Sequence, residues 1–136
     1  MSNITLKKVS IADVSKLQKI GMTTFSETFR EFNTPENLNK YLVESFSIEK
    51  LRSEINNTHS EFYLALDDAK DDTNAIGYLK VNFGESQTEL KDSKSFEIER
   101  IYVLREYQGK NVGQLLYQKA LAIAQQNNVD YIWLGV

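Results

Sequence analysis

A short loop with two glycines could bind an anion. The segment Gln108-Gly109-Lys110-Asn111-Val112-Gly113 follows an apolar run and precedes apolar residues at helical spacing. The first amides of a helix have no partner within it, so a glycine-containing helix start can hold a phosphate. Asn111 tolerates a left-handed conformation, and Lys110 adds positive charge. The segment has neither a Walker A ending nor a Rossmann glycine pattern. Taken alone, it fits a phosphate site or a plain strand-to-helix turn.

Two carboxylates precede this loop. Glu97 and Glu99 are two residues apart, so their side chains share one face of a strand. A carboxylate placed near an amine can accept its proton, directly or through water. The same side chains could instead be solvated or pair with Arg100 and Arg105.

Other chemistries are excluded or disfavoured by the residue types. The chain has no cysteine, which excludes disulfides, thiolate ligands and a cysteine acyl-enzyme. Its single histidine, His59, lies in a polar Asn-Asn-Thr-His-Ser turn, where we expect a surface role. We therefore expect no metal site.

The composition is that of an ordinary folded protein. Of 136 residues, 41% are hydrophobic and 26% charged, which suffices to bury a core. The formal net charge of -3 at pH 7 disfavours nucleic-acid binding and favours cationic small molecules. No run approaches the ~20 apolar residues of a membrane-spanning helix, and the N-terminus lacks the apolar core of a secretory signal. We expect a cytoplasmic protein without a membrane partner.

The spacing of apolar residues predicts an α/β (α+β) order of elements. A capping box at Ser10 and Asp13 starts a helix, and Thr34-Pro35 and Ser47 start two more. Apolar periodicity predicts the remaining elements: strands over 4–9, 61–67, 75–83, 96–103 and 131–136, and a helix over 112–126. This order predicts one domain over 1–136, with a mixed sheet flanked by helices and a right-handed crossover between the last two strands.

Several residues are expected to be structural. Phe25, Phe29 and Phe32 belong most simply to the core, Tyr107 packs, and 67–72 forms a solvated hairpin tip. The last strand has no following element to cover its far edge, and an exposed apolar edge favours association. We expect the chain to be a fragment, or a partner subunit to cover that edge in a homodimer.

These segments resemble the GNAT N-acetyltransferase family. Its central motif, Gln/Arg-x-x-Gly-x-Gly/Ala, matches Gln108 to Gly113, except that Asn111 replaces the middle glycine. Further stretches are similar to PaiA-type spermidine/spermine N-acetyltransferases: 34–37, 41–42, 77–82, 97–103 and 133–136. The resemblance covers nearly the whole chain.

The resemblance implies the GNAT acyl-CoA N-acyltransferase fold and acetyl-CoA as cosubstrate. In that family the loop holds the pyrophosphate of acetyl-CoA, and the backbone of the preceding strand pairs with the pantetheine arm. The strand that follows the helix diverges from the preceding strand and so opens the slot for the thioester. The implied cofactor-binding residues are Ile101, Tyr102, Val103, Gln108, Gly109, Lys110, Asn111, Val112, Gly113 and Gln114. Family members continue with a helix and two strands, so the resemblance implies a domain that is incomplete at the C-terminus. The tyrosine that protonates the leaving thiolate would lie in that missing part.

The resemblance also implies direct transfer of the acetyl group to a primary amine. Only about one aliphatic amine in a thousand is neutral at pH 7, so a base must remove a proton. Glu99 is the first candidate for this base, because it matches the acidic residue of related polyamine acetyltransferases, and Glu97 is the second candidate. A backbone amide near Tyr102 or Val103 would stabilise the oxyanion. The implied acceptor is a polyamine such as spermidine or spermine. The alternatives are a protein or other small-amine acceptor, or a non-catalytic acyl-CoA-binding regulator.

Overall fold

In a computed structural model of the protein, the residues described are 3–69, 75–89 and 92–134. The strands of this part are β1 (Ile4–Lys8), β2 (Ser60–Asp67), β3 (Gly77–Phe83), β4 (Ser95–Val103) and β5 (Tyr131–Leu134). The α-helices are α1 (Val14–Phe29), α2 (Pro35–Ser45), α3 (Ile48–Asn56) and α4 (Val112–Gln126). Short 3-10 turns cover Ile11–Asp13, Arg30–Phe32, Gly84–Ser86 and Arg105–Tyr107.

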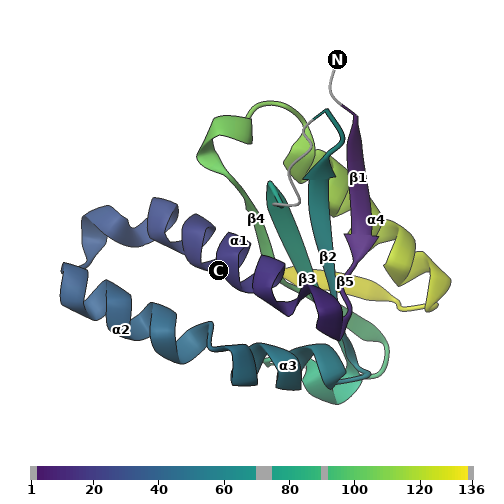
Figure 1. Cartoon of the computed structure of the whole chain (residues 1–136). Coiled ribbons are helices and arrows are strands. Elements are labelled where there is room, and N and C mark those ends of the chain that lie inside the picture. The colour runs from purple at the N-terminus through teal and green to yellow at the C-terminus, as the bar shows by residue number, and fades with distance from the viewer. Residues whose placement is uncertain (1–2, 70–74, 90–91, 135–136) are drawn as a thin grey trace.

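The strands form a mixed sheet in the order β1-β2-β3-β4-β5 (Figure 1). Neighbours from β1 to β4 are antiparallel, and β4 pairs with β5 in parallel after the crossover through α4. The predicted mixed sheet flanked by helices is therefore confirmed.

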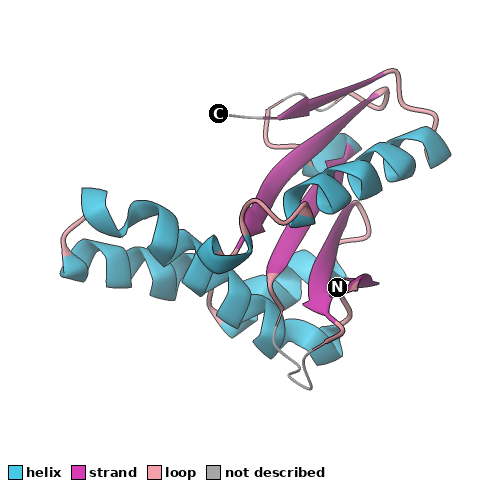
Figure 2. Cartoon of the chain, turned by 90° about the horizontal axis from the view of Figure 1, so that it is seen from above, coloured by secondary structure: helices cyan, strands magenta, loops and turns pink. Residues whose placement is uncertain are grey.

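Helices cover both faces of the sheet (Figure 2). On one face, α4 packs on a cluster that includes Leu79, Val81, Ile98 and Leu116. On the other face, α1 to α3 pack on a cluster that includes Leu17, Leu51, Phe62 and Tyr78. The C-terminal end of α1 and the N-terminal end of α2 extend side by side beyond the sheet and form a helical hairpin (Figures 1 and 2).

The predicted helix starts are confirmed by their caps. The side chains of Thr34 and Ser47 accept hydrogen bonds from the amides of Asn37 and Lys50, each at 3.2 Å. The capping box at Ser10 is present, but it encloses a 3-10 turn that leads into α1. A side chain that bonds the amide three residues later satisfies one of the otherwise unpaired groups of a helix start.

Two expectations about burial are wrong. Phe32 is 78% exposed, because it lies in the turn after α1, where the hairpin has left the sheet. Asp67 is not part of a solvated tip: it is 7% exposed and accepts a hydrogen bond from the Tyr107 hydroxyl at 2.8 Å. Residues 70–74 of that predicted tip, and 135–136 of the last predicted strand, lie outside the described residues.

A buried glutamine joins the β3–β4 connection to the last strand. Gln87 is 1% exposed, and its Oε1 accepts hydrogen bonds from Ser95 Oγ and Trp133 Nε1, both at 2.8 Å. The β3–β4 connection thus has a buried anchor, which fixes β5 beside the start of β4.

Candidate active site

A β-bulge places the acidic and basic residues of β4 on one side of the sheet. Lys80 lies opposite Arg100 and Val81 opposite Ile98, so Glu99 has no partner on β3. Strict alternation would turn Arg100 toward α4. The extra residue instead brings Arg100 to the side of α1 to α3, next to Glu99.

Four charged side chains form a network at this bulge. Lys80 Nζ donates to Glu54 Oε1 at 2.6 Å and lies 2.9 Å from Glu99 Oε1. Arg100 lies 3.3 Å from Glu54 and 3.2 Å from Glu99. The Lys80 side chain is only 9% exposed, so these interactions are less screened by water than surface ion pairs.

Glu99 is held in its ionised form. Burial alone would raise its pKa, but the charges of Lys80 and Arg100 and a hydrogen bond from Asn82 keep the pKa of this carboxyl below its ordinary value. Asn82 Nδ2 donates to Glu99 Oε1 at 2.7 Å. The carboxylate is therefore ready to accept a proton, although its lowered pKa makes it a modest base.

Glu97 shares the face of Glu99, as predicted, but occupies a different environment. The side chain of Asn82 bonds both carboxylates, which places them on one face. Glu97 is 2% exposed and accepts hydrogen bonds from the amide and the hydroxyl of Thr88, at 2.8 and 2.6 Å. These contacts anchor the β3–β4 connection and leave Glu97 little access to a substrate.

Glu99 lines a polar pocket between the sheet and the helices, here called the Glu99 pocket. Its volume is about 230 Å³, and it is lined by Thr24, Phe25, Tyr41, Ser45, Phe46, Lys50, Tyr78, Glu99, Arg100 and Tyr102. Two ring pairs form its walls, Phe25 with Tyr41 and Tyr78 with Tyr102, with centroids 4.4 and 5.9 Å apart. In the described part of the chain, Lys50 has no ion-pair partner.

The glycine loop has the backbone conformation expected of it. Gly109 has φ +83°, and a Cβ added at this position would meet no atom within 4 Å. Glycine is therefore favoured here by the positive φ, and not by a lack of space for a side chain. Asn111 has φ 67° and ψ 13°, the left-handed conformation, and precedes the first residue of α4. The Asn111 side chain does not cap this helix, so the first-turn amides of α4, including those of Gly113 and Gln114, are available to a ligand. Gln108, Lys110 and Gln114 are exposed and Val112 is buried.

Among the described residues, the strand before this loop has an edge that is unpaired beyond Ile98. Pairing of β4 with β5 runs from Ser95 opposite Tyr131 to Ile98 opposite Leu134. Within residues 3–69, 75–89 and 92–134, no strand pairs with the far edge of β4 from Glu99 to Val103. The backbone of Ile101, Tyr102 and Val103 can therefore pair with an extended ligand.

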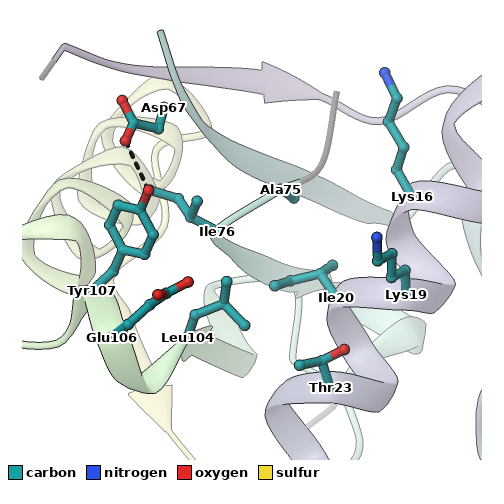
Figure 3. A pocket seen from close by; sticks show the side chains of 10 residues that line it. All are labelled: Lys16, Lys19, Ile20, Thr23, Asp67, Ala75, Ile76, Leu104, Glu106 and Tyr107. Carbon is teal, nitrogen blue, oxygen red and sulfur yellow. Dashed lines mark hydrogen bonds between the residues drawn. The ribbon is translucent and has the colours of Figure 1, made fainter. Parts of the chain in front are cut away.

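A smaller pocket of about 160 Å³ lies between α1 and the end of β4 (Figure 3). Lys16 and Lys19 line it from α1, and the hydrogen-bonded pair of Asp67 and Tyr107 lines it from the opposite side. Tyr107 is 6% exposed and belongs to the core cluster under α4. Its predicted packing role is confirmed. His59 is exposed, as predicted.

Sequence reasoning identifies Arg100 as a partner of Glu99 but misses Lys80 and Glu54, the other two members of the network. Lys80 stands in Gly77-Tyr78-Leu79-Lys80-Val81, where the other residues are apolar or glycine. A lysine in such a strand indicates an ion pair, because buried lysines are rarely unpaired. Glu54 comes from α3, and nothing local to it predicts that contact. The sequence suggests Arg100 only as a partner for the carboxylates, whereas the structure also places it in the lining of the Glu99 pocket.

The described residues offer neither a membrane-spanning helix nor a cluster of metal ligands. Those residues contain no helix that is long and apolar enough to cross a membrane. They also contain no cluster of three or more His, Cys, Asp or Glu side chains suited to a metal ion.

Comparison with known proteins identifies the family. Residues 24–136 match the acetyltransferase (GNAT) family. An uncharacterized N-acetyltransferase in the pepI 3′ region of Lactobacillus delbrueckii subsp. lactis is 32% identical over 136 residues, which cover 100% of this chain and 76% of that protein. A spermidine N(1)-acetyltransferase of Thermoplasma acidophilum is 24% identical over 127 residues, which cover 93% of this chain and 74% of that protein.

Solved structures share the fold. The crystal structure of PaiA N-acetyltransferase from Thermoplasma acidophilum in complex with coenzyme A has a TM-score of 0.81 at 24% identity, covering 98% of this chain and 79% of that chain. An aminoglycoside acetyltransferase from an uncultured soil metagenomic sample, in complex with sisomicin, has a TM-score of 0.69 at 14% identity, covering 98% of this chain and 77% of that chain. This chain belongs to the GNAT family and is an acetyl-CoA-dependent N-acetyltransferase.

Proposed function

We propose that the acceptor of this acetyltransferase is a primary amine of a polyamine such as spermidine or spermine. The observation that carries the proposal is the position of Glu99, whose carboxylate lines a pocket beside the edge of β4 that no described strand pairs with beyond Ile98. The similar Thermoplasma acidophilum protein, a spermidine N(1)-acetyltransferase, supports this acceptor.

The cosubstrate would lie along β4 and the start of α4. Ile101, Tyr102 and Val103 would pair through their backbone with the amide groups of the pantetheine arm. The pyrophosphate would meet the first amides of α4, with the loop from Gln108 to Gln114 around it and Lys110 adding positive charge. This arrangement would place the thioester at the edge of β4, next to the Glu99 pocket.

The charges around the pocket favour a neutral amine. The cations Lys50, Lys80 and Arg100 outnumber the anions Glu54 and Glu99. A nearby excess of positive charge disfavours an ammonium group and lowers its pKa. The reacting amine would therefore lose its proton more easily in this pocket than in water, where only about one amine in a thousand is neutral at pH 7.

Glu99 would take that proton, directly or through one water. The neutral nitrogen then attacks the carbonyl carbon of the thioester, and a backbone amide near Tyr102 or Val103 would stabilise the oxyanion. The carbon–sulfur bond breaks, the thiolate of CoA leaves, and the nitrogen of the new carbon–nitrogen bond gives up its remaining extra proton to the thiolate or to water. Glu97 is not needed in this scheme, because Thr88 and Asn82 already occupy its oxygens.

The acceptor is tested by thiol release from acetyl-CoA with separate amines. Spermidine, spermine, lysine, an aminoglycoside and a peptide with a free N-terminus are compared at equal concentration, and the products are identified by mass spectrometry. We expect the highest kcat/KM with spermidine or spermine. A higher kcat/KM with the peptide or the aminoglycoside would contradict the polyamine proposal. Tight acetyl-CoA binding without turnover of any amine would favour a regulator instead.

A further inference from the structure

A second pocket adjoins the Glu99 pocket on the α1–α2 hairpin. This pocket, here called the α2 pocket, has a volume of about 510 Å³ and is lined by Phe25, Asn33, Asn37, Leu38, Lys40, Tyr41 and Glu44. Phe25 and Tyr41 also line the Glu99 pocket. Their stacked rings, with planes 13° apart, form a wall common to the two pockets.

The lining of the α2 pocket suits an alkyl chain that carries a positive charge. Phe25, Leu38 and Tyr41 offer apolar surface for methylene groups. The faces of the two aromatic rings attract cations. The carboxylate of Glu44 lies at the exposed side of the pocket, and no described residue forms an ion pair with it.

The hairpin that holds the α2 pocket is negatively charged, although the two charged residues that line the pocket itself, Lys40 and Glu44, cancel. Between Glu27 and Ser45 the chain has four glutamates against one arginine and one lysine, so this hairpin carries much of the protein's net charge of -3. The Glu99 pocket instead has an excess of cations. A negative hairpin raises the local concentration of cationic ligands.

A linear polyamine fits this division. Its reacting amine must be neutral, whereas its distal amines stay protonated near neutral pH. We propose that the α2 pocket is a second acceptor subsite, which binds the distal ammonium group and the alkyl spacer of the acceptor. This inference rests on the proposed polyamine acceptor and adds where the unreactive end of that acceptor binds. Tyr41 then separates the reacting end from the charged end.

The α2 pocket offers a matched pair of charge variants. Glu44 and Lys40 both line it, are one helical turn apart on α2, and are absent from the Glu99 pocket. Glu44→Gln removes an attraction for the distal ammonium group, and Lys40→Gln removes a repulsion. Their effects on a polycationic acceptor should therefore have opposite signs. Glu49→Gln, an exposed glutamate on α3 outside both pockets, is the control.

The experiment compares spermine with n-butylamine, which has no distal charge. We expect Glu44→Gln to raise the ratio of KM for spermine to KM for n-butylamine about fivefold, the effect of one exposed ion pair. We expect Lys40→Gln to lower this ratio and Glu49→Gln to leave it unchanged. Calorimetric titration of the CoA-bound protein with spermine should give the same order of Kd values.

Equal changes of both KM values, or no change in either variant, would overturn the subsite while leaving the acetylation of spermine intact. The proposed function fails differently, through an absence of thiol release with wild-type protein and any polyamine. In that case the titrations still decide the inference, since the Kd for spermine either depends on Glu44 and Lys40 in opposite directions or does not.

Discussion

Lys80 Nζ lies 2.9 Å from Glu99 Oε1 across the β-bulge that brings the charged residues of β4 to one side of the sheet. This contact, together with Arg100 and Asn82, keeps the pKa of Glu99 low although burial alone would raise it. The proposed base is thus tuned by a residue of the neighbouring strand. Its protonation state and the stability of the network should change together when Lys80 is replaced.

Replacement of Lys80 by methionine should shift the pH dependence of activity. Without the cation, the pKa of Glu99 rises, so less of the ionised form is present at a given acidic pH. We expect the acidic limb of the kcat/KM profile to move to higher pH. The free energy of unfolding should fall by about 3 kcal/mol, because one partner of a buried network is removed. The measurements are a pH–rate profile and denaturant unfolding at neutral pH.

The matched control is Lys8→Met. Lys8 lies 3.5 Å from Glu61, but its side chain is 62% exposed, and such a pair contributes less than about 1 kcal/mol. The control should leave the pH profile in place. If Lys80→Met also left it in place, Lys80 would not tune the proton acceptor.

Replacement of Asn111 by glycine should leave stability and CoA binding intact, whereas replacement by valine should reduce both. Its φ of 67° strains a β-branched side chain by about 1 to 2 kcal/mol, whereas glycine adopts this conformation freely. We expect Asn111→Val to lose that much stability and to weaken CoA binding, because the first amides of α4 would shift. Asn111→Gly should bind CoA as the wild type does. Thermal unfolding and calorimetric titration with CoA test this, and equal CoA affinity in both variants would contradict the proposed pyrophosphate site.

Tyr107→Phe should affect stability and not activity. The hydroxyl of Tyr107 donates to Asp67 Oδ2 inside the protein, and a hydrogen bond to a charged group contributes about 2 kcal/mol. Tyr117→Phe is the control, because Tyr117 is 44% exposed, and surface substitutions usually change stability by less than about 0.5 kcal/mol. Denaturant unfolding measures both. A large loss of kcat in Tyr107→Phe at full stability would show that Tyr107 acts in the reaction.

The sequence predicted the elements well where local signals were strong. The helix over 112–126 has the predicted bounds, because its apolar period is regular and the Asn127-Asn128 turn ends it. Thr34 and Ser47 start helices as expected, since a cap acts on amides three residues away. These features depend on neighbours in the chain and can be predicted without the fold.

The site was predicted only in part. Glu99 and the glycine loop can be proposed as site residues from local patterns and the family resemblance. The bulge cannot be predicted in this way, because an extra residue in a strand changes which side chains share a face without changing the composition. The contact of Glu54 with Lys80 joins residues 26 positions apart, and only the packing of α3 on the sheet brings them together. Phe32 was assigned to the core because helical spacing does not tell where a helix leaves the sheet.

The role of Glu99 can be separated from that of Glu97 by the same conservative change at each position. Glu97→Gln should lower stability, since Glu97 accepts three hydrogen bonds in the core, and should leave kcat for spermidine close to that of the wild type. A loss of kcat in Glu97→Gln without a loss in Glu99→Gln would exchange their proposed roles.

The most direct test is thiol release from acetyl-CoA with saturating spermidine, compared between the wild type and Glu99→Gln. Glutamine keeps the size of the side chain and an oxygen for Asn82 and Lys80, but it cannot take the amine proton. We predict rapid release by the wild type and a loss of about 10² to 10⁴ in kcat for the variant, with unchanged acetyl-CoA binding. Release by Glu99→Gln at the wild-type rate would contradict the account.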